Sequence, residues 1–345
     1  MPDELSPRRV GRRLLALAAV GIAVAVTVLT GPGLGELRKR VAHASPGWLF
    51  AGLGLEVLST LCYVVIFRAV FCPRMRWRLS YLIGMSEQGA NSVLSVSGAG
   101  GLALGAWALH RGGMNSEQIG RKSVAFFFLT SLANVVGVVA LAALYAGGAL
   151  GHDPNAALTD GFGAAALAVT LLVLALPWWL GGVSLPPTTP PEASRVAAVW
   201  SFARYSLGEG VRGGVVLLRR RSPAVLLGSF GTMAFDLAVL GVCFRAFGYS
   251  PPIGVLALGY LIGQLGGNIP VPGGIGGVDF GLIGTFALYH QPLAATTAAV
   301  LAYHAIALWV PGLLGSAAFL QLHRTLQRQS RPAATCAPLG EPIAG

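Results

Sequence analysis

Long apolar stretches separated by short polar segments dominate the sequence. Six of them have the length of an ordinary membrane-spanning helix, which takes about 20 mostly apolar residues. These predicted spans are residues 14–30, 48–71, 124–150, 162–180, 224–247 and 295–320. The pattern predicts an all-α, polytopic integral membrane protein built as a helical bundle.

Two further stretches, residues 79–109 and 253–290, are apolar but interrupted by glycine, proline and polar residues. Each is too long for one crossing and too broken for one regular helix. Irregular backbone persists at membrane depth only where it is buried in protein or lines a cavity. We therefore expect two re-entrant helical hairpins in addition to the six spans.

The positive charges predict how these segments are oriented. Arginines precede and basic residues follow the first broken stretch: Arg74, Arg76, Arg78, Arg111, Arg121 and Lys122. No Lys or Arg lies between Arg245 and Arg324, a region that includes the second broken stretch. Because basic residues favour the cytoplasmic side, the hairpins should open on opposite sides, with both termini cytoplasmic. The basic residues 38–40 are the exception, since they would be external.

The two broken stretches also resemble each other. Residues 98–105 match residues 274–281, with glycines at the same four places. Upstream of these, Gln88 and Asn91 correspond approximately to Gln264 and Asn268. Three full spans separate the copies, so the second copy would be inverted, as in many transporters. Glycine is common in this chain, and chance glycine matches are the alternative.

Composition and charge agree with a membrane protein. Hydrophobic residues make up 54% of the chain and charged residues 11%, whereas ordinary soluble domains carry about 25% charge. The net charge of +11 would suggest nucleic acid in a soluble protein. Here the charges lie between apolar runs, so topology signals and contacts with anionic headgroups explain them better. We expect no nucleic-acid partner.

The predicted organisation is one transmembrane domain, residues 14–322, between cytoplasmic tails. Residues 1–13 form the first tail, and residues 323–345 form a disordered second tail. The first span resembles a signal peptide, but a basic segment separates it from the nearest cleavage-like triplet, so we expect it to stay uncleaved. A cytoplasmic linker, residues 184–223, should contain an amphipathic helix at 194–222 in the headgroup layer. A solvated linker helix is the alternative.

Ionisable side chains inside apolar segments are costly and are hypotheses of function. They include Glu56, Glu87, Asp236, Asp279 and His304. Asp279 follows a run of prolines and glycines, where free backbone amides and a helix start favour an anion. A purely structural first-turn carboxylate is the alternative. The candidate substrate-binding residues are Asn268, Pro270, Pro272, Gly273, Gly274, Gly276, Asp279, His304, Glu87, Asn91 and Arg111.

No catalytic or metal-binding constellation is evident in the sequence. The motifs of zinc proteases, nucleotide-binding loops and serine hydrolases are missing, so we expect no enzyme activity, no cofactor and no metal.

Two motifs resemble a known family. The run from Pro270 to Asp279, PVPGGIGGVD, and the run from Tyr303 to Gly312, YHAIALWVPG, resemble the transmembrane domain of lysylphosphatidylglycerol synthases and its free-standing flippase-like relatives. That family shows P-x-P-G-G-x-G-x-x-E and Y-R-x-x-x-x-W-x-P. Here Asp279 replaces glutamate and His304 replaces arginine. Gly101 and Leu104 stand where many relatives carry an acidic residue and an arginine.

The resemblance implies a lipid flippase or translocase that moves a phospholipid or glycolipid with a polar headgroup across the cell membrane. Membrane lipids, anionic or polar in their headgroups, would be its partners. Only some twenty residues follow the last predicted span, so we expect no aminoacyl-lipid synthesis. The alternative function is a non-catalytic subunit or scaffold of a cell-envelope biosynthesis complex, with an envelope partner or a second copy of the chain.

Overall fold

The structure is a computed structural model of the chain. It describes residues 34–93, 99–179, 195–264 and 277–328, and a few isolated residues between 15 and 31. All regular structure in these ranges is α-helical. The helices are α2 (Gly35–Ala42), α3 (Pro46–Phe71), α4 (Trp77–Val93), α5 (Ala99–Arg111), α6 (Ser116–Ala146), α7 (Ala156–Trp179), α8 (Arg195–Arg219), α9 (Pro223–Ala246), α10 (Ile253–Gly263), α11 (Gly277–Leu288) and α12 (Leu293–Arg328).

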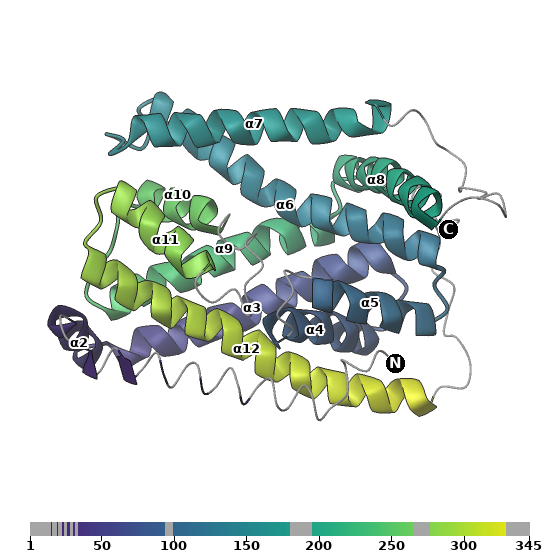
Figure 1. The fold of residues 1–345 in the computed structure, drawn as a ribbon, viewed down its shortest axis with the longest axis horizontal. Coiled ribbons are helices and arrows are strands. Elements are labelled where there is room, and N and C mark those ends of the chain that lie inside the picture. Colours follow the sequence, from purple (N-terminus) through teal and green to yellow (C-terminus); the bar gives the residue numbers. More distant parts are fainter. Residues whose placement is uncertain are drawn as a thin grey trace.

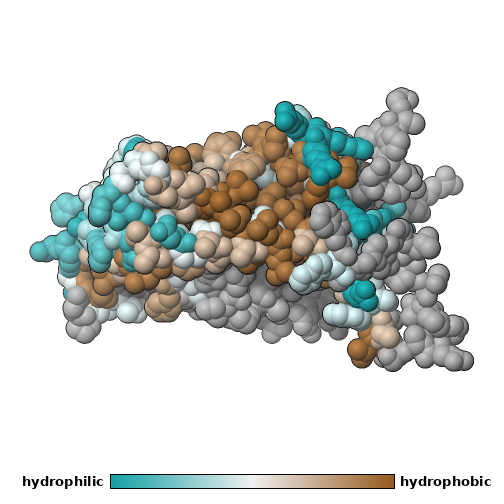
Figure 2. Space-filling view, turned by 90° about the horizontal axis from the view of Figure 1, so that it is seen from above, coloured by the Kyte–Doolittle hydropathy of each residue, from teal (hydrophilic) through white to brown (hydrophobic). Residues whose placement is uncertain are grey.

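Five helices among the described residues are long and apolar enough to cross a membrane: α3, α6, α7, α9 and α12. They coincide with five of the six predicted spans, and the polytopic helical fold is therefore confirmed. The remaining predicted span, residues 14–30, lies largely outside the described residues. An apolar surface over the middle of the molecule, with hydrophilic residues toward both ends, agrees with this arrangement (Figure 2).

Each broken stretch contains two short helices. The first is α4 and α5, and the second is α10 and α11; the helices of each pair pack on each other. The two hairpins lie at opposite ends of the bundle (Figure 1). The expectation of two oppositely facing hairpins is confirmed for the described residues.

The helices pack as two matching sets of four. The sets are α3 to α6 and α9 to α12, with α7 and α8 between them in the sequence. Every contact between neighbouring helices of one set has a counterpart in the other: α3 with α4 and α9 with α10, α5 with α6 and α11 with α12, α3 with α6 and α9 with α12. The contacts across the sets also match, since α3 meets α12 as α9 meets α6, and α4 meets α12 as α10 meets α6.

The helices α3 and α9 run antiparallel through the centre. Near one end a Cβ on Gly52 would lie 3.4 Å from the Val242 side chain. Near the other end a Cβ on Gly228 would lie 2.8 Å from the backbone nitrogen of Ile66. Because the equivalent helices of the two sets point in opposite directions, the repeat is inverted, as the glycine matches predicted.

Small residues allow the two sets to approach closely elsewhere as well. A Cβ built on Gly89 in α4 would lie 2.7 Å from the Cα of Gly315 in α12. Real Cβ atoms do not approach a backbone this closely, so only glycine permits this contact. Such small-residue contacts are typical of helices packed within membranes.

At the C-terminal end of each central helix, a basic side chain donates a hydrogen bond to a backbone carbonyl. The Nζ of Lys122, which is buried, donates to the Phe71 carbonyl at the end of α3, at 2.6 Å. A guanidinium nitrogen of Arg40 in α2 donates to the Phe247 carbonyl after α9, at 3.2 Å. Cations stabilise helix carboxyl ends. Arg40 therefore has a structural role at the end of the bundle where the basic residues 38–40 depart from the charge rule.

Helix α8 lies beside α6 at the end of the bundle that holds the first hairpin (Figure 1). The Tyr205 hydroxyl donates to Glu117 of α6 at 2.7 Å. Burial, and then this bond, raises the pKa of Tyr205 to about 12. The first turns of α8 expose Val196, Val199 and Trp200. A helix is thus present where one was predicted, and its placement in a headgroup layer stays a prediction.

Candidate functional site

The site begins where the second hairpin restarts as a helix. Asp279 occupies the first turn of α11, and only 8% of its surface is exposed. The first turn exposes free backbone N–H groups and the positive end of the helix dipole, both of which stabilise a carboxylate. The sequence folds this way because glycines and prolines precede Gly277 and apolar residues follow it.

Helix α12 brings His304 against this carboxylate. The Nδ1 of His304 lies 2.9 Å from Oδ1 of Asp279. Among the described residues, the opposite ring nitrogen, Nε2, is buried and has no hydrogen-bond partner. The pairing of Asp279 with His304 joins the two motifs that carry the family resemblance.

A second polar cluster lies at the centre of the bundle, where α3 crosses α9. The Ser59 hydroxyl donates to Oδ1 of Asp236 at 2.6 Å, and the Tyr260 hydroxyl donates to Oδ2 at 3.2 Å. Glu56, one turn before Ser59 on α3, is also buried. The cluster therefore combines two carboxyl groups from different helices.

The two clusters are connected through α12. The ring of Tyr303, the residue before His304, packs edge to face with that of Tyr260, with centroids 6.3 Å apart. Its hydroxyl accepts a hydrogen bond from the Gln264 amide at 3.0 Å. Gln264 ends α10, directly before residues 265–276. Polar side chains therefore link the bundle centre with the second hairpin.

In the first hairpin, Asn91 and Glu87 make contacts within the fold. The side-chain oxygen of Asn91 accepts from the backbone nitrogen of Gly101 at 2.9 Å and so caps the start of α5. Glu87 is 3% exposed and is hydrogen-bonded to Tyr63 of α3. A Cβ on Gly105 would lie 2.7 Å from the Glu87 carboxylate. The helices α4 and α5 are therefore in close contact at these positions.

The same packing explains one departure from the family pattern. A Cβ on Gly101 would overlap the side chain of Asn91 and the backbone carbonyl of Glu87. An acidic side chain at this position would not fit without moving α4 away from α5. The glycine at position 101 therefore permits the close contact of α4 with α5.

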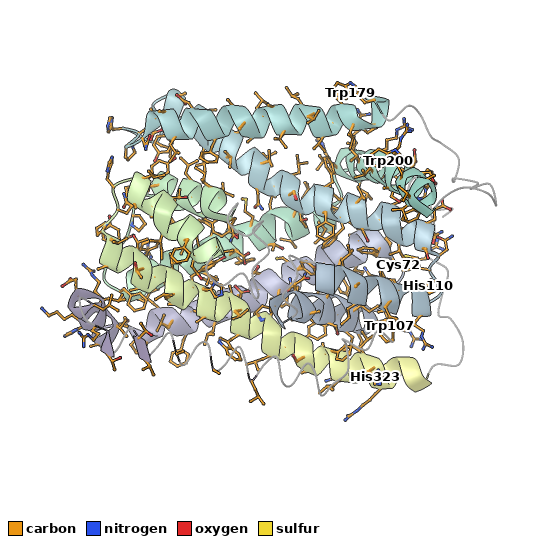
Figure 3. All side chains as sticks on the ribbon, viewed as in Figure 1. Cys72, Trp107, His110, Trp179, Trp200 and His323 are labelled. Carbon is orange, nitrogen blue, oxygen red and sulfur yellow. The ribbon has the colours of Figure 1, made fainter. Side chains whose placement is uncertain are left out.

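The remaining candidate residues are not gathered with Asp279 and His304. Arg111 is exposed at the end of α5, and its neighbour His110 marks this end, away from α10 and α11, in Figure 3. Six candidates lie outside the described residues: Asn268, Pro270, Pro272, Gly273, Gly274 and Gly276. Their role in substrate binding, like that of Glu87, Asn91 and Arg111, stays a prediction.

Sequence reasoning did not find Ser59 and Tyr260, or the meeting of Glu56 with Asp236. One signal was available. Both central helices begin with Ser-Pro, at Ser45 and Ser222, and both end with Phe-Arg-Ala, centred on Arg68 and Arg245. The shared spacing of 177 residues also relates position 59 to position 236, and it would have predicted their meeting at the centre of an inverted repeat.

These features define the class of the protein: a polytopic helical membrane protein with an inverted repeat, two oppositely placed hairpins and buried ionisable groups where its helices meet. Residues 13–315 match the family described as the lysylphosphatidylglycerol synthase TM region. The chain belongs to this family, as its two motifs predicted. The family is one of membrane proteins in lipid modification or translocation. No curated protein matches the sequence significantly.

Proposed function

We propose that this protein is a flippase-like translocase, without enzyme activity, that moves a lipid with a polar headgroup across the cell membrane. The observation that carries the proposal is the contact of His304 with Asp279, at 2.9 Å, on the first turn of a helix that restarts inside the bundle. Interrupted helices form the substrate sites of many transporters with inverted repeats, and the amino end of a helix restarting there favours an anionic group.

The chemistry of the pair suits a phosphate or sugar headgroup. The carboxylate of Asp279 lies against Nδ1 of His304, and Nε2 is a buried polar atom without a partner among the described residues, which a headgroup oxygen would satisfy. The start of α11 adds backbone N–H donors, which favour anionic oxygens. Lipid tails would remain in the bilayer while the headgroup passes along the interrupted helices.

The charge distribution supports an orientation for this activity. The ends of α3, α5 and α12 that carry Arg68, Arg111 and Arg324 would face the cytoplasm, because basic residues are retained on that side. The hairpin of α10 and α11 would then open to the opposite side. Both termini would be cytoplasmic.

A transfer assay in vesicles tests the proposal. The purified full-length chain is reconstituted into liposomes that contain, in turn, a fluorescent anionic phospholipid, a zwitterionic phospholipid and a glycolipid. Quenching from outside then measures movement between leaflets. We expect headgroup-dependent transfer that Asp279→Ala lowers at least tenfold. Asp160→Ala, at an exposed position of α7, is the matched control and should transfer lipid normally.

Equal transfer by the Asp279→Ala protein and the wild-type protein, for every lipid, would contradict the proposal. Transfer by protein-free vesicles sets the baseline. A folded Asp279→Ala protein, shown by its elution as a single species and by an unchanged helical circular dichroism spectrum, excludes unfolding as the reason for the loss.

A second candidate, a scaffold for a cell-envelope biosynthesis complex, is favoured by the exposed apolar start of α8. Val196 is 79% exposed, Val199 68% and Trp200 65%. Trp200 lies at the same end of the molecule as exposed Trp179 of α7 (Figure 3). Photo-crosslinking from position 200 in native membranes separates the alternatives: capture of a specific protein supports a scaffold, and capture of lipid alone supports a helix lying in the headgroup layer.

A further inference from the structure

Glu56 is a buried acid with an unsatisfied oxygen. It lies in the middle of α3 with 4% of its surface exposed. Among the described residues, its Oε2 is buried and has no hydrogen-bond partner. A carboxylate in this position would lack the donors that normally replace water around a buried charge.

Asp236, by contrast, has the partners of an ionised carboxylate. Ser59 donates to one of its oxygens and Tyr260 to the other. Ser59 follows Glu56 by one helical turn, so both side chains project from the same face of α3 toward α9. The two carboxyl groups interact electrostatically. Glu56 also interacts with Cys243, two turns beyond Asp236.

Within the described part of the chain, the titratable groups that interact with the pair are acidic or neutral. Asp236 and Cys243 face Glu56 from α9, Tyr260 approaches from α10, and Tyr303 approaches from α12. No ion pair of Glu56 or Asp236 occurs among residues of the described ranges.

The charged groups on the other neighbours of α3 are engaged elsewhere. Glu87 of α4 is hydrogen-bonded to Tyr63, and Lys122 of α6 donates a hydrogen bond to the Phe71 carbonyl. Two adjacent carboxylates without a cation repel each other strongly in a medium of low dielectric constant. One proton on the pair removes this repulsion.

We propose that Glu56 and Asp236 form a proton-binding site at the centre of the inverted repeat. Asp236 is the anion, held by Ser59 and Tyr260, and Glu56 carries the exchangeable proton. The ligand is a proton rather than a metal ion, because the hydroxyl groups of Ser59 and Tyr260 donate their hydrogens to Asp236 and no group of three or more His, Cys, Asp or Glu side chains that could hold a metal occurs among the described residues. The site joins helices of opposite halves, so its protonation changes a contact between the halves.

The site also has a polar connection to the second hairpin. Tyr260 donates a hydrogen bond to Asp236, and its ring packs against that of Tyr303. The Gln264 amide donates a hydrogen bond to the Tyr303 hydroxyl. His304 follows on α12. In a lipid translocase, this arrangement would couple a proton gradient to the headgroup site. That coupling rests on the function proposed above, whereas the proton-binding site itself does not.

Carbodiimide labelling tests the site independently of lipid transport. Dicyclohexylcarbodiimide reacts with protonated carboxyl groups in apolar surroundings, and mass spectrometry of digested full-length protein locates the adduct. In nanodiscs we expect an adduct at Glu56 that disappears as the pH is raised and that sodium ions, at constant pH, do not suppress. Glu56→Gln should remove this adduct and leave any adduct at the buried Glu87.

Asp236→Asn provides the second variant. Removing the neighbouring charge should move the pH at which half of Glu56 is labelled toward lower values. Three results would overturn the proposal: no adduct at Glu56 at any pH, protection of Glu56 by sodium ions, or an unchanged midpoint in folded Asp236→Asn protein. If a variant does not fold, the pH and sodium dependence of the wild-type adduct decides alone.

Discussion

The Ser59 hydroxyl donates a hydrogen bond to Asp236, at 2.6 Å, across the centre of the inverted repeat. The two residues are related by the same spacing of 177 positions that relates Pro46 to Pro223 and Arg68 to Arg245. Corresponding positions of two inverted copies meet only on the axis between them. The bundle therefore places its central charged group at the one location where both halves contribute the same position.

The Ser59 contact should be energetically important because it supports a buried charge. A hydrogen bond to a charged group contributes about 1.5–3 kcal/mol. Ser59→Ala should therefore lower the free energy of unfolding in nanodiscs by a similar amount, which a lower melting temperature would report. Tyr260→Phe removes the other donor to Asp236. The double variant should lose more than the sum of the single losses, because Asp236 is then left without the hydroxyl donor on either of its oxygens. Additive losses would show that the two donors act independently.

The close contact between α4 and α12 should not tolerate side chains. Gly315→Val forces atoms into the backbone of Gly89 and Met85. Overpacking of this kind costs typically about 1–3 kcal/mol, and a lower melting temperature should report it. Gly284→Ala is the matched control, because nothing lies within 4 Å of a Cβ at that position of α11. Equal stability of both variants would contradict this account of the contact.

The buried Lys122 should stabilise the end of α3 by its bond to the Phe71 carbonyl. Lys122→Met retains most of the apolar stem but removes the donor, and an unsatisfied buried acceptor costs about 1–3 kcal/mol. Unfolding in detergent at increasing temperature measures the loss. Lys39→Met, at an exposed position of α2, removes the same charge and should be neutral. A similar small effect of both changes would rule out this role for Lys122.

His304 should tolerate arginine better than alanine. His304→Ala removes the imidazole ring that lies against the Asp279 carboxylate, and a buried polar group that loses its partner costs about 1–3 kcal/mol. Lipid transfer in the vesicle assay should therefore fall at least tenfold. His304→Arg supplies the residue that is usual in the family motif and retains a donor for Asp279, so transfer should persist. Loss of transfer with arginine and not with alanine would contradict the proposed pairing.

Hydropathy predicted the spans well because each long helix is apolar over most of its length. The boundaries differ where polar residues extend a helix beyond the hydrocarbon. The predicted span 124–150 is preceded in the structure by two polar turns, which begin at Ser116 after the Asn115 cap. Likewise α12 continues to Arg328 through a basic final segment. Apolar composition alone carries no information about such ends.

The candidate site was only partly accessible from sequence. Asp279 and His304 were predicted because each is an ionisable residue in an apolar segment, and the structure brings them together. The cap made by Asn91 and the close fit of Glu87 against Gly105 depend on the angle between α4 and α5. The contact of Ser59 with Asp236 depends on how two distant helices cross. Neither relationship is determined by the local pattern of residues.

The backbone contact of Gly89 with Gly315 has a mechanical consequence. It fastens the first hairpin to α12, the helix that carries His304. A displacement of α4 relative to the rest of the bundle would therefore be transmitted along α12 toward His304, the partner of Asp279. Pro311 lies between Gly315 and His304 on α12 and removes one backbone hydrogen bond of the helix, so the helix can bend between the two contacts.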